Sequence, residues 1–389
     1  MFRFDPYSPE VDADPFPFYK TLRDDYPCFW SEEANMWILS RHADILTALN
    51  DWQTYSSAQG NLMTELPGRA GSTLGTTDPP RHDRLRSLIQ MAVTKRALDH
   101  ILEPARASIN EHLDAIGDAS NFDFVGQIAS RYTVDLLFYL FNMPEESKQA
   151  VHHNAVLMVQ SDPITHTKGP EHIAAFQWMS DFSAQLIEER KVNPGEDLMS
   201  QFILAEIDGE KLLDREVQMT VTTLIMAGVE SMSGFMSMMA LNLADHPEQR
   251  RMLVENPALI PDAVEESLRY NTSAQRFRRI LTRDVELHGQ TMKAGDFVGL
   301  AYGSGNRDER QFVNPDVYDV SRKPKGHLGF GGGVHACLGT AIARLACKVA
   351  FEEFLQRYPE FSRVEQQLPW ISSSTFRSPT RLTLSSDEK

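Results

Sequence analysis

Cys337 ends a glycine-rich stretch, Phe330-Gly331-Gly332-Gly333-Val334-His335-Ala336-Cys337-Leu338-Gly339. Glycine lets a backbone bend tightly and come close to a ligand. A helical pattern begins at about Leu338, and the partial positive charge of a helix N-terminus favours a cysteine thiolate over the thiol. A thiolate among backbone N–H groups suits a haem iron, because sulfur then pushes electron density onto bound oxygen. Binding of a haem iron through sulfur is therefore one interpretation of this stretch.

Two simpler interpretations of this loop must be weighed. A run of glycines can bind phosphate, but the dinucleotide-binding pattern needs a preceding strand in a βαβ unit. Here residues 303 to 336 are rich in Gly, Pro, Asp and Asn and are predicted to form a long ordered loop. Free cysteines are also often simply buried. The spacing argues against both interpretations, because it defines a far more specific motif.

Phe330-Gly-x-Gly-x-His335-x-Cys337-x-Gly339, followed by Ala343-Arg344, resembles the cysteine signature of the cytochrome P-450 family at every defining position. The resemblance implies that Cys337 is the axial ligand of a haem b iron and that His335 meets a haem propionate. It also implies that Phe330 packs near the sulfur. The remaining expected cofactor-binding positions of the loop are glycines that shape it, Gly331, Gly333 and Gly339.

Asp78-Pro79-Pro80 is predicted to start a helix, with Asp78 as N-cap and proline at the first position. His82 and Arg86 follow four residues apart, on one helix face. The simplest interpretation is two solvated side chains. The family's His-x-x-x-Arg motif instead implies that both hold haem propionates, through charge-assisted hydrogen bonds. By the same resemblance, Arg279 is the remaining propionate-binding arginine.

A long helical pattern carries an acid beside an alcohol, in Ala227-Gly228-Val229-Glu230-Ser231. Glycine inside a helix costs about 1 kcal/mol relative to alanine, and a hydroxyl bonded to the preceding turn can bend a helix. A local distortion is therefore expected. By the resemblance, it leaves room for dioxygen at Ala227 and Gly228, while Glu230 relays protons and Ser231 assists oxygen activation. The family usually has threonine here, so weaker coupling of electrons to product is expected.

Glu266 and Arg269 lie three residues apart on one helix face, where an acid and an arginine can pair. Taken alone, this would be a surface salt bridge of little energetic value. The resemblance implies that the pair is buried and locks the cysteine loop with a third member, for which Arg322 is the candidate. The expected role of these three residues is structural.

The resemblance covers essentially the whole chain and implies a monooxygenase. One atom of dioxygen enters a small, mainly apolar organic substrate, by hydroxylation or oxidative demethylation, with electrons from a ferredoxin and its NAD(P)H-dependent reductase. The haem carries this chemistry, and the protein supplies sulfur, proton route and pocket. Arg276 could meet a substrate carboxylate, but a position that faces solvent or the haem is expected instead. Family position indicates these substrate contacts: Leu224, Ala227, Ala274, Phe277 and Phe376.

Docking of an acidic ferredoxin conflicts with the chain's net charge of -16, because like charges repel. A local basic patch around the cysteine face could resolve this conflict. The alternative is that these cations are scattered surface charges. The candidate patch residues are Arg81, Arg84, Lys95, Arg96, Arg344 and Lys348.

Three other functions remain as alternatives. A peroxide-consuming haem-thiolate enzyme would tend to carry an arginine where this chain has Glu230-Ser231. A haem-based gas sensor would have no need of this acid–alcohol pair and often carries a signalling domain. A zinc site built on His335 and Cys337 lacks further local ligands at zinc spacing.

Composition restricts the remaining possibilities. A hydrophobic content of 42% can build a sizeable core, and the negative charge argues against a broad nucleic-acid footprint. Three cysteines are too few for a disulfide framework, and an odd number fits a reducing cytoplasm. We see no signal peptide and no apolar run near the roughly 20 residues that span a bilayer. A cytoplasmic protein is expected and, by the resemblance, a monomer.

The elements that must position these residues are mostly helical. Apolar spacing predicts long helices from about Asp214 to Ala244, from Pro261 to Tyr270 and from Leu338 to Tyr358. Short strands are expected at 276–301 and in the tail. The fold class is mainly α with small β-sheets (α+β), and the resemblance implies the cytochrome P-450 fold. That fold is a single triangular helix-rich domain, 1–389, with a long central helix over the haem. Smaller β-containing portions, about 1–75 and 276–389, would pack on a helical core of about 78–270.

Overall fold

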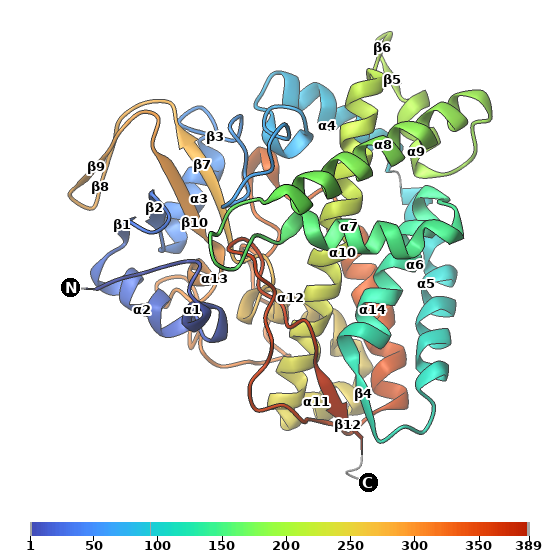
Figure 1. The fold of residues 1–389 in the computed structure, drawn as a ribbon. Helices are drawn as coiled ribbons and strands as arrows, with labels where there is room; N and C mark the ends of the chain where they lie inside the picture. The colour runs from blue at the N-terminus through green and yellow to red at the C-terminus, as the bar shows by residue number, and fades with distance from the viewer. Residues whose placement is uncertain (1, 94, 387–389) are drawn as a thin grey trace.

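The computed structural model describes residues 2–93 and 95–386, and the side chains of residues 95–99 fall outside that description. Figure 1 shows a large body of helices beside a smaller region that holds most of the strands. This is the mainly helical architecture with small sheets that the sequence predicts. The long helix α10 (Asp214–Asp245) runs through the helical body, where helices that precede it and helices that follow it in the sequence pack on it.

The helices span most of the chain between residues 81 and 270. Their bounds are α1 (Pro9–Ala13), α2 (Phe16–Asp25), α3 (His42–Asn50), α4 (Arg81–Ala92), α5 (Lys95–Ile116), α6 (Ser130–Phe141), α7 (Lys148–Val159), α8 (Pro170–Val192), α9 (Leu198–Leu204), α10 (Asp214–Asp245), α11 (Pro247–Glu255), α12 (Ile260–Tyr270), α13 (Tyr302–Gly305) and α14 (Thr340–Arg357). A π-helical turn, Phe124–Ala129, precedes α6.

The strands form one main sheet, one small sheet and two hairpins. Their bounds are β1 (Cys28–Ser31), β2 (Met36–Leu39), β3 (Tyr55–Ser56), β4 (Asn121–Asp123), β5 (Glu206–Ile207), β6 (Glu210–Lys211), β7 (Arg276–Leu281), β8 (Val285–Leu287), β9 (Gln290–Met292), β10 (Phe297–Ala301), β11 (Ser362–Arg363) and β12 (Thr383–Ser385).

α10 begins and ends where local signals place its ends. Glu216 accepts a hydrogen bond from the backbone N–H of Leu213 at 3.0 Å, which satisfies a free donor at the first turn. The helix ends before His246-Pro247, since proline cannot continue it. By length and composition α10 could cross a membrane, but 78% of its most apolar stretch is buried inside the protein. A mostly buried core helix passes the same test.

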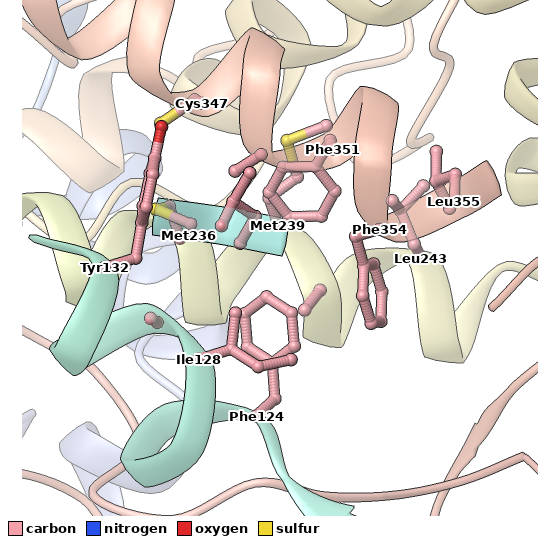
Figure 2. Close-up of a cluster of buried hydrophobic side chains, with 14 of the residues drawn as sticks. Phe124, Ile128, Tyr132, Met236, Met239, Leu243, Cys347, Phe351, Phe354 and Leu355 are labelled. Carbon is pink, nitrogen blue, oxygen red and sulfur yellow. The ribbon is translucent and has the colours of Figure 1, made fainter. Parts of the chain in front are cut away.

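One hydrophobic core lies between α10, α14 and the π-helical turn. Figure 2 shows Phe124 facing Met239 of α10 and the aromatic rings of α14. Phe124 and Phe354 pack with their ring centroids 5.0 Å apart. The thiol of Cys347 is fully buried in this cluster and faces away from solvent. α14 is therefore fixed firmly behind the loop that carries Cys337.

The main sheet joins the two strand-rich parts of the chain. Its order is β1-β2-β10-β7-β3, with β10 parallel to β2 and the other pairs antiparallel. Arg279 on β7 lies opposite Val298 on β10. The turn between β8 and β9 uses His288 and Gly289, both with positive φ, as two-residue hairpin turns require. The small sheet, β11-β12-β4, ties the C-terminal tail to the turn before α6.

Candidate active site

The loop before Cys337 folds back on itself. The Cys337 N–H donates to the Phe330 carbonyl at 2.9 Å, and the Gly331 N–H donates to the Leu328 carbonyl at 2.9 Å. Gly331 and Gly333 have φ of 66° and 62°, a region that favours glycine. At Gly333 an added Cβ would also overlap the backbone carbonyl of Leu49. The loop can therefore take this course only with glycine at position 333.

Cys337 lies just ahead of α14, whose N-cap is Gly339. Its side chain is exposed, yet enough protein surrounds the sulfur for burial to raise the pKa of the thiol. The Gly339 N–H, the Thr340 hydroxyl and the charge of Arg86 act in the opposite direction. The N–H at the start of α14 thus favours the thiolate, as expected, but burial outweighs this effect for the thiol by itself. A side chain at Gly339 would have room, 3.9 Å from the sulfur, so this glycine contributes its N–H rather than its size.

The predicted N-cap of the helix that carries His82 and Arg86 is wrong. α4 begins at Arg81, with Pro80 at its N-cap position. The side chain of Asp78 instead accepts a hydrogen bond from the Ser57 N–H at 3.0 Å. It lies 3.7 Å from Nε2 of His335. Asp78 therefore faces the cysteine loop rather than the helix that follows it.

His82 and His335 come from distant segments and meet edge to face. Their ring centroids lie 4.6 Å apart. Both rings are buried, and neither Nε2 of His82 nor either nitrogen of His335 has a hydrogen-bond partner among the described residues. Nδ1 of His82 lies 2.9 Å from a carboxylate oxygen of Asp83. Buried polar atoms normally have partners, so these three nitrogens indicate a missing acceptor.

Arg86 and Arg279 complete this cluster. Arg86 donates to the carbonyls of Val334 and Ala336, at 3.1 and 2.9 Å, and so holds the cysteine loop directly. Arg279 donates to the carbonyl of Arg278 at 2.8 Å.

The charged groups of this cluster also act on the pKa of His335. Burial lowers this pKa, Asp78 raises it, and the charges of Arg279 and His82 lower it further. The structure therefore brings together His82, Arg86, Arg279 and His335 beside Cys337. Such a set of donors could hold an anionic cofactor. Among residues 2–93 and 95–386, no group of three or more His, Cys, Asp or Glu side chains could hold a metal ion by itself.

Between Met219 and Leu243, α10 is buried except along one partly accessible face. The accessible positions are Thr223, Leu224, Ala227, Gly228 and Ser231. Their spacing of three and four residues puts them on one side of the helix. Leu224 and Leu338, the residue after Cys337, pack against the same hydrophobic cluster. The acid–alcohol segment and the cysteine loop thus border one region.

Gly228 does not distort α10, contrary to the expectation. α10 is assigned as α-helix throughout this segment. A Cβ at Gly228 would lie 3.0 Å from a methyl group of Leu137, so the glycine permits close packing of α6. Ser231 donates to the carbonyl of Ala227 one turn earlier. Glu230 is 8% exposed, and burial raises its pKa to about 7 although a bond from Ser378 lowers it.

The residues expected to contact substrate lie together. Ala274 and Phe376 form an isolated antiparallel bridge, and the rings of Phe277 and Phe376 meet at 5.8 Å. All three, with Leu224, belong to or pack against one hydrophobic cluster. Arg276 does not join them: it is fully buried, donates to the carbonyl of Ser374 at 2.8 Å and lies 3.9 Å from Asp12. The expectation that Arg276 faces solvent is therefore wrong.

Glu266, Arg269 and Arg322 meet behind the cysteine loop. Two hydrogen bonds of 2.8 Å join the guanidinium of Arg269 to the carboxylate of Glu266, and both side chains are 0% exposed. Nε of Arg322 lies 3.2 Å from the same carboxylate. Arg269 also donates to the carbonyls of Asn306 and Pro315, at 3.0 and 2.8 Å. The triad thereby fixes the long loop that leads to Cys337.

The proposed basic docking patch is less positive than the sequence indicates. Arg84 binds Glu210 and Glu216 at 2.7 and 3.0 Å, and Arg81 lies 3.6 Å from Glu216.

The cations of α14 are paired in the same way. Arg344 makes two bonds to Glu265, of 2.6 and 2.7 Å, and Lys348 binds Glu352 at 2.7 Å. The side chains of Lys95 and Arg96 lie outside the described residues. Each described cation of the set thus has an acidic neighbour, because acids outnumber bases in this chain.

Sequence reasoning missed two residues of the site, Ser378 and Gly234. Ser378 bonds to Glu230 from the C-terminal tail. Its neighbourhood contains no recognisable motif, and the contact spans 148 positions. Gly234 gave a signal that could have been read, because a glycine one turn after the acid in an apolar helix needs a packing reason.

Comparison with known proteins agrees with this arrangement. The family model described as Cytochrome P450 matches residues 12–381. Nocardicin C N-oxygenase of Nocardia uniformis subsp. tsuyamanensis is 34% identical over 97% of each chain. The methyl-branched lipid omega-hydroxylase of Mycobacterium bovis is 31% identical over 92% of this chain and 85% of its own length.

A similar solved structure is that of cytochrome P450 CYP109Q5 from Chondromyces apiculatus. It superposes with a TM-score of 0.90 over 98% of both chains, at 29% sequence identity. The extent of these matches, together with the geometry around Cys337, places the chain in the cytochrome P450 family of monooxygenases.

Proposed function

We propose that this chain is a haem-thiolate monooxygenase in which Cys337 is the axial ligand. The observation that carries the proposal is the set of unpartnered donors beside the sulfur. The free nitrogens of His82 and His335, with the guanidiniums of Arg86 and Arg279, fit the two propionates of haem b. When bound, the haem would supply the reduction and activation of dioxygen.

The chain's own residues would hold and orient that cofactor. To serve both Asp83 and a propionate, His82 must donate through both ring nitrogens, which is the imidazolium form. Arg86 links the propionate side to the cysteine loop, since it already binds two carbonyls there. The Gly339 N–H and the Thr340 hydroxyl stabilise negative charge on the sulfur of Cys337.

Protons would be supplied from α10. Glu230 is buried with a pKa of about 7, so it can both release and take up a proton near neutral pH. Ser231 lies on the accessible face of the same helix and offers a hydroxyl that can donate and accept. This acid–alcohol pair supports use of dioxygen rather than direct consumption of peroxide.

The substrate would be a small, mainly apolar molecule. Leu224, Ala274, Phe277 and Phe376 supply apolar surface, and Arg276 is turned toward Ser374 and Asp12. The relatives oxidise different atoms, as the names nocardicin C N-oxygenase and methyl-branched lipid omega-hydroxylase state. A substrate panel scored by the spin-state shift of the haem would find the chemical class. We further propose electron supply from a ferredoxin and its reductase, to a cytoplasmic monomer.

The first test is the absorption spectrum of the dithionite-reduced protein with carbon monoxide. We expect a strongly red-shifted Soret band in the wild type and its loss in Cys337→Ala. Cys347→Ala, a matched loss of a cysteine in the buried face of α14, should keep the band. A band typical of a histidine-ligated haem, or equal spectra for both variants, would overturn the proposal.

A further inference from the structure

The carboxyl group of Glu230 is held by a residue near the end of the chain. Oγ of Ser378 donates to Oε1 of Glu230 at 2.6 Å. Ser378 is 2% exposed and Glu230 8% exposed. Among the described residues Ser378 is the only hydrogen-bond partner of this carboxyl group, and Oε2 is not among the fully buried atoms without a partner. One oxygen is therefore fixed and the other is free to exchange a proton.

A missing side chain on α10 makes this contact possible. Gly234 lies one turn after Glu230, on the same face of the helix. A Cβ at Gly234 would stand 2.8 Å from Cβ of Ser378 and 3.5 Å from Cβ of Ser273. The glycine thus lets the C-terminal segment (red in Figure 1) approach α10 closely enough for Ser378 to reach the acid.

The segment that carries Ser378 is fixed on both sides. Its carbonyl accepts from the Ile371 N–H at 3.0 Å, and the preceding N–H, of Arg377, donates to the Ser273 carbonyl at 2.8 Å. The guanidinium of Arg377 binds Asn271 at 3.1 Å and the carbonyl of Ala13 at 2.8 Å. Ser378 therefore has little freedom to turn away from Glu230.

The surroundings of Glu230 contain no compensating charge. Burial raises its pKa, the bond from Ser378 lowers it, and no charged side chain of the described residues shifts it. The neighbouring residues near Gly234 are the hydroxyl residues Ser273 and Ser378. Ser273 turns its hydroxyl to the backbone carbonyl of Ser231 at 3.2 Å rather than to the acid. The ionised form of Glu230 is stabilised by a hydrogen bond from Ser378 alone.

We infer that Ser378 is a positioning residue for Glu230 in oxygen activation, fixing Oε1 so that the exchangeable proton is carried on Oε2. This inference rests on the proposed monooxygenase function. In each proton transfer the O–H bond on Oε2 breaks, the Ser231 hydroxyl on the accessible face of α10 takes up that proton and gives its own proton to the reacting oxygen, and a proton from bulk solvent restores the acid. Ser378 keeps its own proton and its bond to Oε1 throughout.

The test compares Ser378→Ala with Ser273→Ala in the haem-loaded protein. Both changes remove one buried hydroxyl beside Gly234, but only Ser378 touches Glu230. The protonated carboxyl band of Glu230, identified by its loss in Glu230→Gln, is titrated by infrared difference spectroscopy without turnover. Ser378→Ala should raise the midpoint by about one pH unit or more, since a hydrogen bond to the charged form is lost. Ser273→Ala should leave the midpoint unchanged.

Turnover supplies the second measurement. Product formed per electron pair consumed should fall several-fold in Ser378→Ala and recover in Ser378→Thr, which keeps the hydroxyl. Gly234→Ala keeps Ser378 but pushes it away, so it should shift the midpoint in the same direction. A wild-type midpoint and wild-type coupling in Ser378→Ala would overturn the inference. Failure of the proposed function would appear separately, as a wild-type protein without the red-shifted carbon monoxide band, while the titration still reports on Ser378.

Discussion

His82 and His335 meet edge to face at 4.6 Å, and three of their four ring nitrogens lack a partner among the described residues. Leaving buried donors unpaired costs free energy. We therefore expect these ring nitrogens to bind a ligand. Arg86 stands one turn after His82 on α4 and binds the cysteine loop. The four-residue spacing that the sequence presents is thus completed by a histidine some 250 positions away.

Arg86→Ala should release haem. A charge-assisted bond to a carboxylate contributes roughly 1.5–3 kcal/mol, so affinity should fall about tenfold or more. The measurement is haem per protein after purification and the rate of haem transfer to a scavenging apoprotein. Arg84→Ala is the control, because Arg84 lies on the same helix and pairs with Glu210 and Glu216. Equal haem loss in both variants would contradict the role of Arg86.

Glu266→Ala should destabilise the protein far more than Glu265→Ala. Glu266 and Arg269 are both 0% exposed, and removing one partner of a buried pair costs about 3–5 kcal/mol. Glu265 is 23% exposed, pairs with Arg344 at the surface and also lies 2.9 Å from Nε2 of His327; partly exposed pairs contribute about 1 kcal/mol or less each. Urea denaturation followed by tryptophan fluorescence measures both changes. Similar midpoints for these adjacent positions would show that burial does not decide the difference.

Stability should depend on pH through Glu230. Its pKa is about 7 in the folded protein, against an ordinary value of 4.5 for glutamate. The folded state therefore disfavours ionisation, and stability is lost as pH rises from about 4.5 to 7. Relative to Glu230→Gln, the wild-type free energy of unfolding should fall by about 3 kcal/mol across this window and stay level above it. Parallel stability curves for the two proteins between pH 5 and 8 would contradict this.

Much of the fold could be predicted from periodicity. The apolar spacing of α10, α12 and α14 placed their ends within two residues, because buried helices repeat every three to four positions and end at glycine or proline. The predicted N-cap at Asp78 was wrong because the carboxylate of this residue makes tertiary contacts instead. It accepts a hydrogen bond from Ser57 and lies near His335. Local capping rules do not include partners from other segments.

The residues of the site show the same difference between local motifs and long-range contacts. The positions of Cys337, His82 and Arg86 could be expected from spacing within short motifs. Ser378 could not, since its contact with Glu230 depends on how the C-terminal segment packs beside Gly234. The pairing of surface charges could not be predicted from the sequence either. Arg344 is 47% exposed, as a docking residue would be, but Glu265 binds it through two hydrogen bonds.

Ser231→Thr should improve coupling and Ser231→Ala should reduce it. The hydroxyl of Ser231 binds the carbonyl of Ala227, and serine can leave that rotamer more freely than threonine, whose methyl group restricts χ1. The expected result is several-fold less hydrogen peroxide per dioxygen consumed in Ser231→Thr, and several-fold more in Ser231→Ala. Oxygen uptake and peroxide are measured together with a substrate that shifts the spin state. Equal peroxide yields in all three proteins would remove Ser231 from the proton route.

Electron transfer from an acidic ferredoxin should respond in opposite directions to Arg344→Ala and Glu265→Gln. Arg344 is neutralised by Glu265 through bonds of 2.6 and 2.7 Å. Removing the cation leaves a net negative site that repels the donor, whereas removing the acid frees the cation to attract it. At low ionic strength the reduction rate, followed as formation of the carbon monoxide complex, should fall several-fold in Arg344→Ala and rise in Glu265→Gln.

Both effects should shrink at high salt, because screening weakens interactions between exposed charges. Unchanged rates in both variants would place the docking surface elsewhere, while haem spectra identical to the wild type would exclude damage to the cysteine loop as the cause of any change.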